Sequence, residues 1–325
     1  MKVISAKRLT KVFAGKIRAV DGVDLEIEAG EIFGFLGPNG AGKTTTLRML
    51  ATLLPIDAGE ATVAGYDVRR EPGKVRQHIG YVSQLGGADL LATAREDLLL
   101  QGQLYGMSSA NARKRAGELI DILDLADFAD RRVDTYSGGQ KRRLHVALGL
   151  MHYPEVLFLD EPTTGLDPQN RANLWGQIRK LRDSGTTIFL TTHYLEEADA
   201  LSDRLAIMDH GRIVAEGTSR ELKQQISGDS IVLSLKEDSG NLAKAAVLFK
   251  TLPYVKEISQ EGDDLRLYVK DGASTLPEIL RLLDKENLAV KTAGLSEPTL
   301  DDVFLRQTGR SLRDTAFAGQ NGEEK

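Results

Sequence analysis

Eight residues near the start of the chain have the types and spacing needed to hold phosphate groups. The run Gly37-Pro38-Asn39-Gly40-Ala41-Gly42-Lys43-Thr44 lies between a predicted strand and a predicted helix, as a phosphate-binding loop does. Its glycines let backbone N–H groups turn toward phosphate oxygens, and the helix N-terminus adds its dipole. Lys43 can reach the β- and γ-phosphates, and the Thr44 hydroxyl can ligate Mg²⁺. The alternative is a tight glycine-rich turn without a ligand. Eight matching positions between the right elements favour a nucleotide site.

Two carboxylates follow an apolar strand in Val156-Leu157-Phe158-Leu159-Asp160-Glu161. A buried strand does not need two acids at its end, because isolated buried charge is costly. If this strand lies beside the phosphate loop, Asp160 can hold Mg²⁺ through water and Glu161 can polarise the water that attacks the γ-phosphate. Taken alone, the pair would mark the point where a strand reaches the surface. Together with the loop, it predicts a catalytic role.

Two further polar residues stand where predicted strands end. His193 follows TTIFLTT and Gln84 ends GYVSQ; the carboxyl edge of a parallel sheet is where ligands bind. His193 can bond the γ-phosphate or the attacking water, and the Gln84 amide can complete a metal shell. Taken as isolated residues, both are better explained as strand-end or surface side chains.

A second glycine turn begins at Tyr136 in YSGGQKRRLHVALGL. Ser137 is a good N-cap, Gly138 and Gly139 expose backbone N–H groups, and an apolar helical face follows. The structural alternative is a capped helix with a basic first turn formed by Lys141, Arg142 and Arg143. The residue chemistry of this stretch does not decide between the two.

The elements that must position these residues alternate along the chain. Strands are predicted at 23–27, 32–36, 155–160 and 186–192, with a hairpin turning near 209–211, and the leucines at 47, 50 and 54 have helical spacing. This alternation favours an α/β fold with a mainly parallel sheet. A helical, charge-rich region from about 90 to 151 interrupts it.

The composition changes after residues 224–230, QQISGDS, which form a polar link. Beyond it the predicted order is β-α-β-β-α-β, with a last strand near 288–290, as in a ferredoxin-like α+β unit. We therefore expect a domain at 1–226 with a helical subdomain at about 88–152, an accessory domain at 229–310, and a disordered tail at 311–325.

The bulk composition narrows the functional classes. The 325 residues carry a net charge of −5, so no general basic field draws the chain to nucleic acid. There are no cysteines, which excludes disulfides and suits a cytoplasmic protein. No stretch approaches the about 20 consecutive apolar residues of a membrane-spanning helix, so we expect a chain that does not cross a membrane by itself.

In their order along the chain, these motifs resemble those of the ATP-binding cassette (ABC) ATPases. The resemblance rests on the phosphate loop, Gln84, YSGGQ, the strand ending in Asp160-Glu161, GLD at 165–167 and His193. It implies a RecA-like parallel core with N-terminal antiparallel strands and a helical subdomain, and ATP with Mg²⁺ as cofactors. It also implies a head-to-tail dimer in which the SGGQ stretch of each subunit caps the γ-phosphate held by the other.

The resemblance implies a role for each site residue. Lys43, Thr44 and Thr45 would contact phosphate or Mg²⁺, Gln84 and Asp160 would lie at the metal, Glu161 would be the general base, and His193 would contact the γ-phosphate. Ser137, Gly138, Gly139 and Gln140 would act on the partner's nucleotide, and Asp167 would communicate across the dimer. Phe13 matches the position that stacks on adenine, although an ordinary core phenylalanine explains it equally well.

Two stretches, TTHYLEEADALSDRLAIMDHGRIVAEGT and LSEPTLDDVFLRQTGR, are similar to the daunorubicin-resistance branch of the type-2 ABC exporters. This implies an ATPase that drives export through a separate membrane permease, from the inner face of the cell membrane, with a drug or lipid-like substrate. An importer ATPase, or a soluble ABC ATPase acting on nucleic acid or ribosomes, are the alternatives. The chain departs from the usual pattern at Tyr136, where leucine is commoner, and at Asp97, where this branch often has asparagine.

Overall fold

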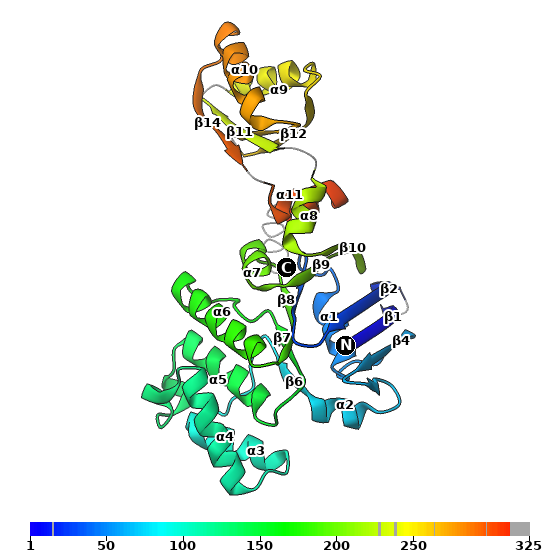
Figure 1. Ribbon diagram of the computed structural model, residues 1–325, viewed down its shortest axis with the longest axis vertical. Coiled ribbons are helices and arrows are strands. Elements are labelled where there is room, and N and C mark those ends of the chain that lie inside the picture. Colours follow the sequence, from blue (N-terminus) through cyan, green and yellow to red (C-terminus); the bar gives the residue numbers. More distant parts are fainter. Residues whose placement is uncertain (15, 227–228, 237–238, 263, 297, 313–325) are drawn as a thin grey trace. The chain divides into compact units, whose positions relative to one another are not determined.

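The computed structural model describes residues 1–312 except 15, 227–228, 237–238, 263 and 297. The chain forms two compact units. The first unit comprises residues 1–219 and the segment that begins at Arg310, and the second unit comprises residues 220–309. Figure 1 shows the elements of each. Residues 220–226, which we had expected in the first domain, pack with the second unit.

A six-stranded sheet forms the centre of the first unit, in the order β10-β9-β3-β8-β7-β6. All neighbouring strands are parallel except β9 and β10, which form the predicted hairpin. The strands are β3 (Ile32–Leu36), β6 (Ile79–Val82), β7 (Val156–Asp160), β8 (Thr187–Thr192), β9 (Arg204–Asp209) and β10 (Arg212–Gly217). Every residue of β3, β7 and β8 is buried, as expected for central parallel strands covered on both faces. The predicted α/β class is confirmed.

A second, antiparallel sheet contains the N-terminal strands in the order β2-β1-β4-β5. These are β1 (Lys2–Phe13), β2 (Ile17–Glu28), β4 (Ala58–Val63) and β5 (Tyr66–Asp67). Ile4 and Val20 of this sheet share one hydrophobic core with Phe33 and Phe158 of the central sheet. The ring centroid of Phe189 lies 5.8 Å from that of Phe33 and 5.6 Å from that of Phe158, so these aromatic side chains fix the central strands against one another.

The first helix of the first unit is shorter than its sequence pattern suggested. Helix α1 (Lys43–Leu50) ends before Leu54, because the chain turns at Thr52, whose φ is 62°. The prediction that helical spacing continues to Leu54 is therefore wrong. The first unit also contains α2 (Pro72–His78), α6 (Pro168–Asp183) and α7 (Leu195–Leu201), which lie outside the helical region at about 90–151.

The helical region contains three α-helices: α3 (Ala94–Leu104), α4 (Ser109–Ile122) and α5 (Gly138–Leu150). Two short 3-10 turns, Ala126–Phe128 and Val133–Thr135, connect α4 to α5. Each of the three helices has a serine or threonine as its N-cap, whose side-chain oxygen accepts a hydrogen bond from a backbone N–H group of the first turn. This bond satisfies a donor that the helix itself leaves unpaired. Figure 1 shows these helices grouped together, away from the antiparallel sheet.

The second unit has the predicted β-α-β-β-α-β order after helix α8 (Ser219–Gln225). Its elements are β11 (Asp229–Leu235), α9 (Ser239–Lys250), β12 (Val255–Glu261), β13 (Asp264–Val269), α10 (Gly272–Lys285) and β14 (Val290–Ser296). The strands form an antiparallel sheet in the order β12-β13-β11-β14, so the ferredoxin-like expectation is confirmed. The last strand runs from 290 to 296 rather than 288 to 290, and Leu288 is a core residue that precedes it.

The stretch LSEPTLDDVFLRQTGR, singled out in the sequence, contains helix α11 (Leu300–Thr308). Thr299 and Asp302 form a capping box at its start, and Asp302 also accepts hydrogen bonds from Tyr268 and, at 3.5 Å, from Arg266. The motif thus anchors α11 to strand β13. Of the expected tail, Ser311 and Leu312 are buried, and residues 313–325 lie outside the described residues.

The separate core of the second unit can be tested at Phe249, which is fully buried on α9. We expect Phe249→Ala to lower the free energy of unfolding of this unit by about 3–5 kcal/mol, because it leaves a cavity. Circular dichroism should then show an early transition. Trp175, the single tryptophan, lies in the first unit, and its fluorescence transition should not move.

The matched control is Val247→Ala on the same helix, since Val247 is 66 % exposed and should change stability by less than about 0.5 kcal/mol. If the tryptophan transition shifts together with the circular dichroism in Phe249→Ala, the two units do not unfold independently.

Candidate functional site

The phosphate loop connects β3 to α1 and closes around a cavity. Gly42, the N-cap of α1, has a φ of 107°, and a Cβ there would lie 2.3 Å from the carbonyl oxygen of Ala19, so only glycine fits. No side chain caps this helix, so its first N–H groups remain available to an anion. A cavity of about 410 Å³ opens here, lined by loop residues that include Asn39 and Thr45 and by Gln84 and Glu161.

Lys43 projects from the loop into the same site. Its side chain is only 4 % exposed, and Nζ donates to the carbonyl oxygens of Gly37 at 2.8 Å and Pro38 at 3.0 Å. Nζ also lies 3.7 Å from Glu161 Oε1. Burial lowers the pKa of the Lys43 ammonium, and the charges of Glu161 and Asp160 act against that shift. A poorly hydrated positive charge is therefore already held where phosphate oxygens would enter.

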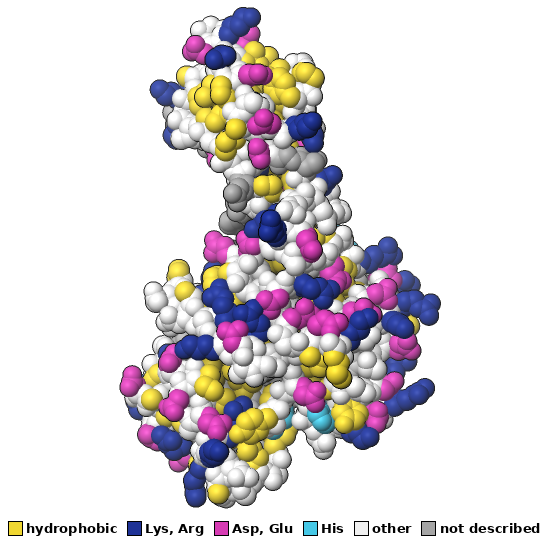
Figure 2. All heavy atoms as spheres, viewed as in Figure 1, with side chains coloured by type: hydrophobic (Ala, Val, Ile, Leu, Met, Phe, Trp, Pro, Cys, Tyr) yellow, Lys and Arg dark blue, Asp and Glu magenta, His cyan; other side chains and the backbone are white. Residues whose placement is uncertain are grey.

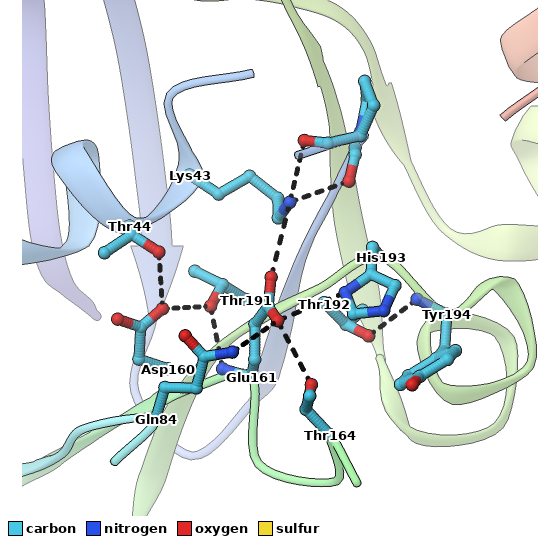
Figure 3. A network of polar contacts seen from close by, with 12 residues as sticks. Lys43, Thr44, Gln84, Asp160, Glu161, Thr164, Thr191, Thr192, His193 and Tyr194 are labelled. Carbon is cyan, nitrogen blue, oxygen red and sulfur yellow. Dashed lines mark hydrogen bonds and ion pairs between the residues drawn. The ribbon is translucent and has the colours of Figure 1, made fainter. Parts of the chain in front are cut away.

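Asp160 ends β7 and is buried. Its Oδ1 accepts hydrogen bonds from Thr44 Oγ1 and from Thr191 Oγ1, both at 2.8 Å (Figure 3). A hydroxyl and a carboxylate that converge beside a phosphate cavity are the hard oxygen donors that Mg²⁺ prefers. Among the described residues no group of three or more His, Cys, Asp or Glu side chains could hold a metal.

Glu161 follows directly and is the centre of the polar network in Figure 3. Besides the Lys43 ammonium, its carboxylate contacts three side chains. Oε2 lies 3.2 Å from His193 Nδ1, 3.1 Å from Thr164 Oγ1 and 3.5 Å from Gln84 Nε2. Burial acts to raise the pKa of Glu161, but the hydrogen-bonding approach and charge of His193 and the charge of Lys43 outweigh it, so the pKa lies below its ordinary value. The carboxylate is therefore ionised at neutral pH.

The backbone at Glu161 is strained. Its φ is +47°, a left-handed conformation that costs an ordinary residue about 1–2 kcal/mol. The N–H group donates to Thr191, whose hydroxyl and carbonyl oxygens lie at 3.1 and 3.2 Å. Such strain persists only where the surroundings over-determine it, and it often occurs at active sites.

The structure brings six of the sequence-predicted residues into one network. They are Lys43, Thr44, Gln84, Asp160, Glu161 and His193. Thr191 and Thr164 also belong to it, and we did not single them out from the sequence. The sequence does contain a feature that could have indicated Thr191: the apolar stretch TTIFLTT ends in two threonines. Hydroxyl groups at the end of a buried strand suggest polar partners nearby.

The remaining predicted residues make their contacts elsewhere. Ser137 caps α5 and forms a capping box with Gln140. Gly139 packs tightly on Asn170, since a Cβ would lie 2.6 Å from its Oδ1, whereas a Cβ on Gly138 would meet only Leu166, at 3.9 Å.

Asp167 caps α6, and hydrogen bonds from Asn170 lower the pKa of its carboxyl. Phe13 ends β1, is 39 % exposed, and has Lys11 Nζ 5.6 Å from its ring centroid. Because Phe13 is partly exposed, it is not an ordinary core residue.

The segment after Gln84 packs on helix α5 through His145. Gly86 has no side chain, and a Cβ there would lie 1.9 Å from His145 Cε1, so the ring rests directly on the Gly86 backbone. Burial, followed by the charges of Arg142 and Lys141, lowers the pKa of His145 from 6.5 to about 4. His145 is therefore neutral at physiological pH.

Comparison with known proteins agrees with these motifs. Residues 20–164 match the ABC transporter family model, and residues 217–308 match the C-terminal domain of DrrA1-3-like ATP-binding proteins. The daunorubicin/doxorubicin resistance ATP-binding protein DrrA of Streptomyces peucetius is 44 % identical over 324 residues, covering 100 % of this chain and 98 % of that protein. The Nod factor export ATP-binding protein I of Burkholderia lata is 40 % identical, covering 96 % and 98 %.

Solved ATP-binding cassettes share the fold of the larger part of the chain. One, described as a dimer in a post-hydrolysis state bound to ADP and Pi, is 29 % identical with a TM-score of 0.60 and covers 66 % of this chain and 98 % of that one. A second, described as the ATP-binding subunit of an ABC transporter, is 26 % identical with a TM-score of 0.62, covering 69 % and 92 %.

The buried neutral state of His145 predicts a pH dependence of stability. Its pKa of about 4 in the folded protein lies below the ordinary 6.5, so protonation favours unfolding. This contribution to stability is complete above about pH 6.5 and is lost as the pH falls from there toward 4. We expect the melting temperature to decrease less between pH 7.5 and pH 5 in His145→Gln than in the original chain, as measured by differential scanning calorimetry. Equal decreases would show that the pKa of His145 does not differ between the folded and unfolded states.

Proposed function

The chain belongs to the ATP-binding cassette transporter ATPases, in the branch of the daunorubicin resistance ATP-binding proteins, and we propose how its site and its partners act. It is the ATP-hydrolysing subunit that energises an exporter. The observation that carries the proposed mechanism is the network that joins Lys43, Asp160, Glu161 and His193 around the phosphate loop.

In this mechanism the loop N–H groups and Lys43 bind the β- and γ-phosphates. Thr44 and Asp160, with Gln84 nearby, would hold Mg²⁺, which would supply charge neutralisation for phosphoryl transfer. Phosphoryl transfer needs mainly positioning and charge neutralisation from protein, and the buried Lys43 charge supplies part of both.

Glu161 is the proposed general base. Its carboxylate is ionised before nucleotide arrives, because the pKa is lowered by His193 and Lys43. His193, 3.2 Å from Oε2, is placed to orient it and to contact the γ-phosphate.

We further propose that the site is completed by a second copy of the chain. Ser137 and Gly138 are exposed at the start of α5, where helix N–H groups can bind the partner's γ-phosphate, and Gly139 and Gln140 form the same turn. Asp167 lies at the start of α6, two residues after the exposed loop residue Gly165, and would signal across the dimer. Phe13 would stack on adenine. A solved relative is described as a dimer with ADP and Pi bound.

The other proposed partner is an integral membrane permease, which would hold the chain at the inner face of the membrane. None of the helices in the described ranges is long and apolar enough to cross a membrane. Figure 2 shows hydrophobic side chains on the face of the first unit that carries the helical insert. Exposed apolar residues of this region are Leu85, Leu90, Leu91, Leu100, Leu104 and Tyr105. An exposed apolar surface of this kind marks a partner interface.

The proposed cargo is a drug or other hydrophobic, lipid-like compound, and the direction is export. The support comes from the relatives, which are named for resistance to daunorubicin, doxorubicin and linearmycin and for Nod factor export. None of these names favours an importer or an ATPase that acts on nucleic acid.

Substitutions can separate the proposed role of Lys43 in nucleotide binding from that of Glu161 in hydrolysis. Lys43→Ala should weaken binding of a fluorescent ATP analogue at least about 10–100-fold, because it removes a charged hydrogen bond. Glu161→Gln should keep that affinity and reduce phosphate release by about 10²–10⁴-fold. Nearly normal hydrolysis by Glu161→Gln would remove Glu161 from the role of base.

The composite site predicts that ATP drives dimerisation. Light scattering of Glu161→Gln should show the mass rising from 35.5 kDa toward twice that value when ATP and Mg²⁺ are added. A second substitution, Ser137→Phe, should abolish the rise, because it fills the face that meets the partner's phosphate.

The matched control is Ser108→Phe, since Ser108 is an exposed hydroxyl N-cap of α4 and its loss costs a similar amount of helix stability. Loss of dimerisation in both variants would point to damaged helices rather than to a shared site. A constant monomer under every condition would contradict dimerisation by the chain alone.

A further inference from the structure

The buried guanidinium of Arg142 connects helix α5 to two segments of the site, the one that contains Gln84 and the one that contains Glu161. Arg142 is 6 % exposed, and its planar fork donates only to backbone carbonyl oxygens. Nε bonds Pro162 at 2.7 Å, Nη2 bonds Asp160 at 3.0 Å, and Nη1 bonds Ser83 at 2.6 Å and Gln84 at 3.5 Å.

Two of these carbonyls lie on either side of Glu161. Asp160 precedes it and Pro162 follows it, so Arg142 restrains the chain immediately before and after the residue whose backbone has a φ of +47°. Thr191 holds the Glu161 N–H group from the other direction. A strained conformation of this kind persists only when its surroundings restrain it. Thr191 restrains the N–H group of Glu161, and Arg142 restrains the carbonyl groups of the residues before and after it.

The other two carbonyls belong to the segment that carries Gln84. The side chain of Gln84 points back to Glu161, with Nε2 3.5 Å from Oε2. About one turn further along α5, His145 packs on Gly86. The same helix therefore contacts this segment at two places, and Ser137 is its N-cap and Gly138 its first residue.

We propose that Arg142 is a positioning residue for ATP hydrolysis, which fixes the backbone on both sides of Glu161 and the start of the Gln84 segment relative to helix α5. This inference rests on the proposed role of Glu161 as base. Arg142 acts through Glu161 and Gln84, and it does not touch the nucleotide.

The geometry explains why arginine occupies this position. Four carbonyl oxygens from two separate segments are reached by donors in one plane, and only a guanidinium offers such a fork. Burial lowers the pKa of Arg142 to about 10, against the charges of Glu197, Asp160 and Glu161, so the group remains charged at neutral pH. Lysine would keep the charge but could not reach both segments.

The neighbouring Arg143 offers a matched control. It is one residue away on the same helix and also bonds backbone carbonyls, those of Leu123 at 3.5 Å and Asp124 at 2.9 Å. Its guanidinium carbon lies 5.3 Å from the Phe128 ring centroid. Its contacts are therefore within the helical insert and do not include Asp160, Pro162 or Ser83.

The test uses the purified full-length chain with Arg142→Gln, Arg142→Lys and Arg143→Gln. Phosphate release gives kcat and KM, a fluorescent ATP analogue gives the nucleotide Kd, and calorimetry gives the melting temperature. Both Arg142 variants should lose about 10–100-fold in kcat, since small misplacements of a catalytic group have effects of this size. Their nucleotide Kd should change less than about threefold, and Arg143→Gln should retain kcat.

A double-mutant cycle tests whether Arg142 acts through Glu161. Adding Arg142→Gln to Glu161→Gln should reduce the residual phosphate release by less than about threefold, because residues that act as a unit are not additive. A full additional loss of 10–100-fold would overturn the inference. So would normal kcat in both Arg142 variants, or a joint loss of nucleotide binding and stability in both, which would make Arg142 a purely structural residue.

The same data separate this inference from the proposed function. If Glu161→Gln retains nearly normal turnover, the role of Glu161 as base fails, and this inference fails with it. If Glu161→Gln loses turnover while the Arg142 variants retain it, only the role of Arg142 is rejected. If Arg142→Gln does not fold, Arg142→Lys alone supports or rejects the inference by its kcat at unchanged Kd.

Discussion

The pairing register of three parallel strands determines the whole site. In the central sheet β8 lies between β3 and β7, with Asp160 opposite Thr191 and Leu36 opposite Thr192. Parallel strands end at the same edge, so the phosphate loop that follows Leu36 and the carboxylates that end β7 emerge next to each other. A shift of one residue would turn each side chain to the opposite face of the sheet and separate Asp160 from Thr44. The aromatic contacts of Phe189 with both neighbouring strands help to hold this register.

Burial of charge is the second constraint. Lys43, Asp160 and Glu161 all lie in a largely water-excluded region, where an unpaired charge would be very costly. Each is therefore satisfied within the protein: Lys43 by loop carbonyls and Glu161, Asp160 by two threonine hydroxyls, and Glu161 by His193 and Thr164. Nucleotide and metal can bind by exchanging these partners, since they provide the same kinds of charge and donor. The network thus holds the site in shape before ligand arrives.

Helix α5 connects parts of the first unit that serve different purposes. Its N-terminus presents Ser137 and Gly138 to solvent, Arg142 reaches the carbonyls beside Glu161, and His145 supports the Gln84 segment at Gly86. One helix therefore carries the contacts to both the Glu161 and the Gln84 segments. The second unit, in contrast, has its own sheet and core, and Asp302 anchors its helix α11 to β13.

The sequence by itself determined the loop chemistry and the type of most elements. Glycines at positions that tolerate no Cβ, a lysine and a threonine at the helix start, and apolar strands that end in acids are local patterns, and local sterics and hydrophobic period are sufficient to predict them. It also predicted the strand and helix order of the second unit. Only the tertiary structure decided where α1 ends and where β14 begins: the chain turns at Thr52, whose φ is 62°, and Leu288 packs into the core of the second unit before β14 starts. Thr191 and the carbonyl contacts of Arg142 likewise depend on segments far apart in the chain, which no local pattern brings together.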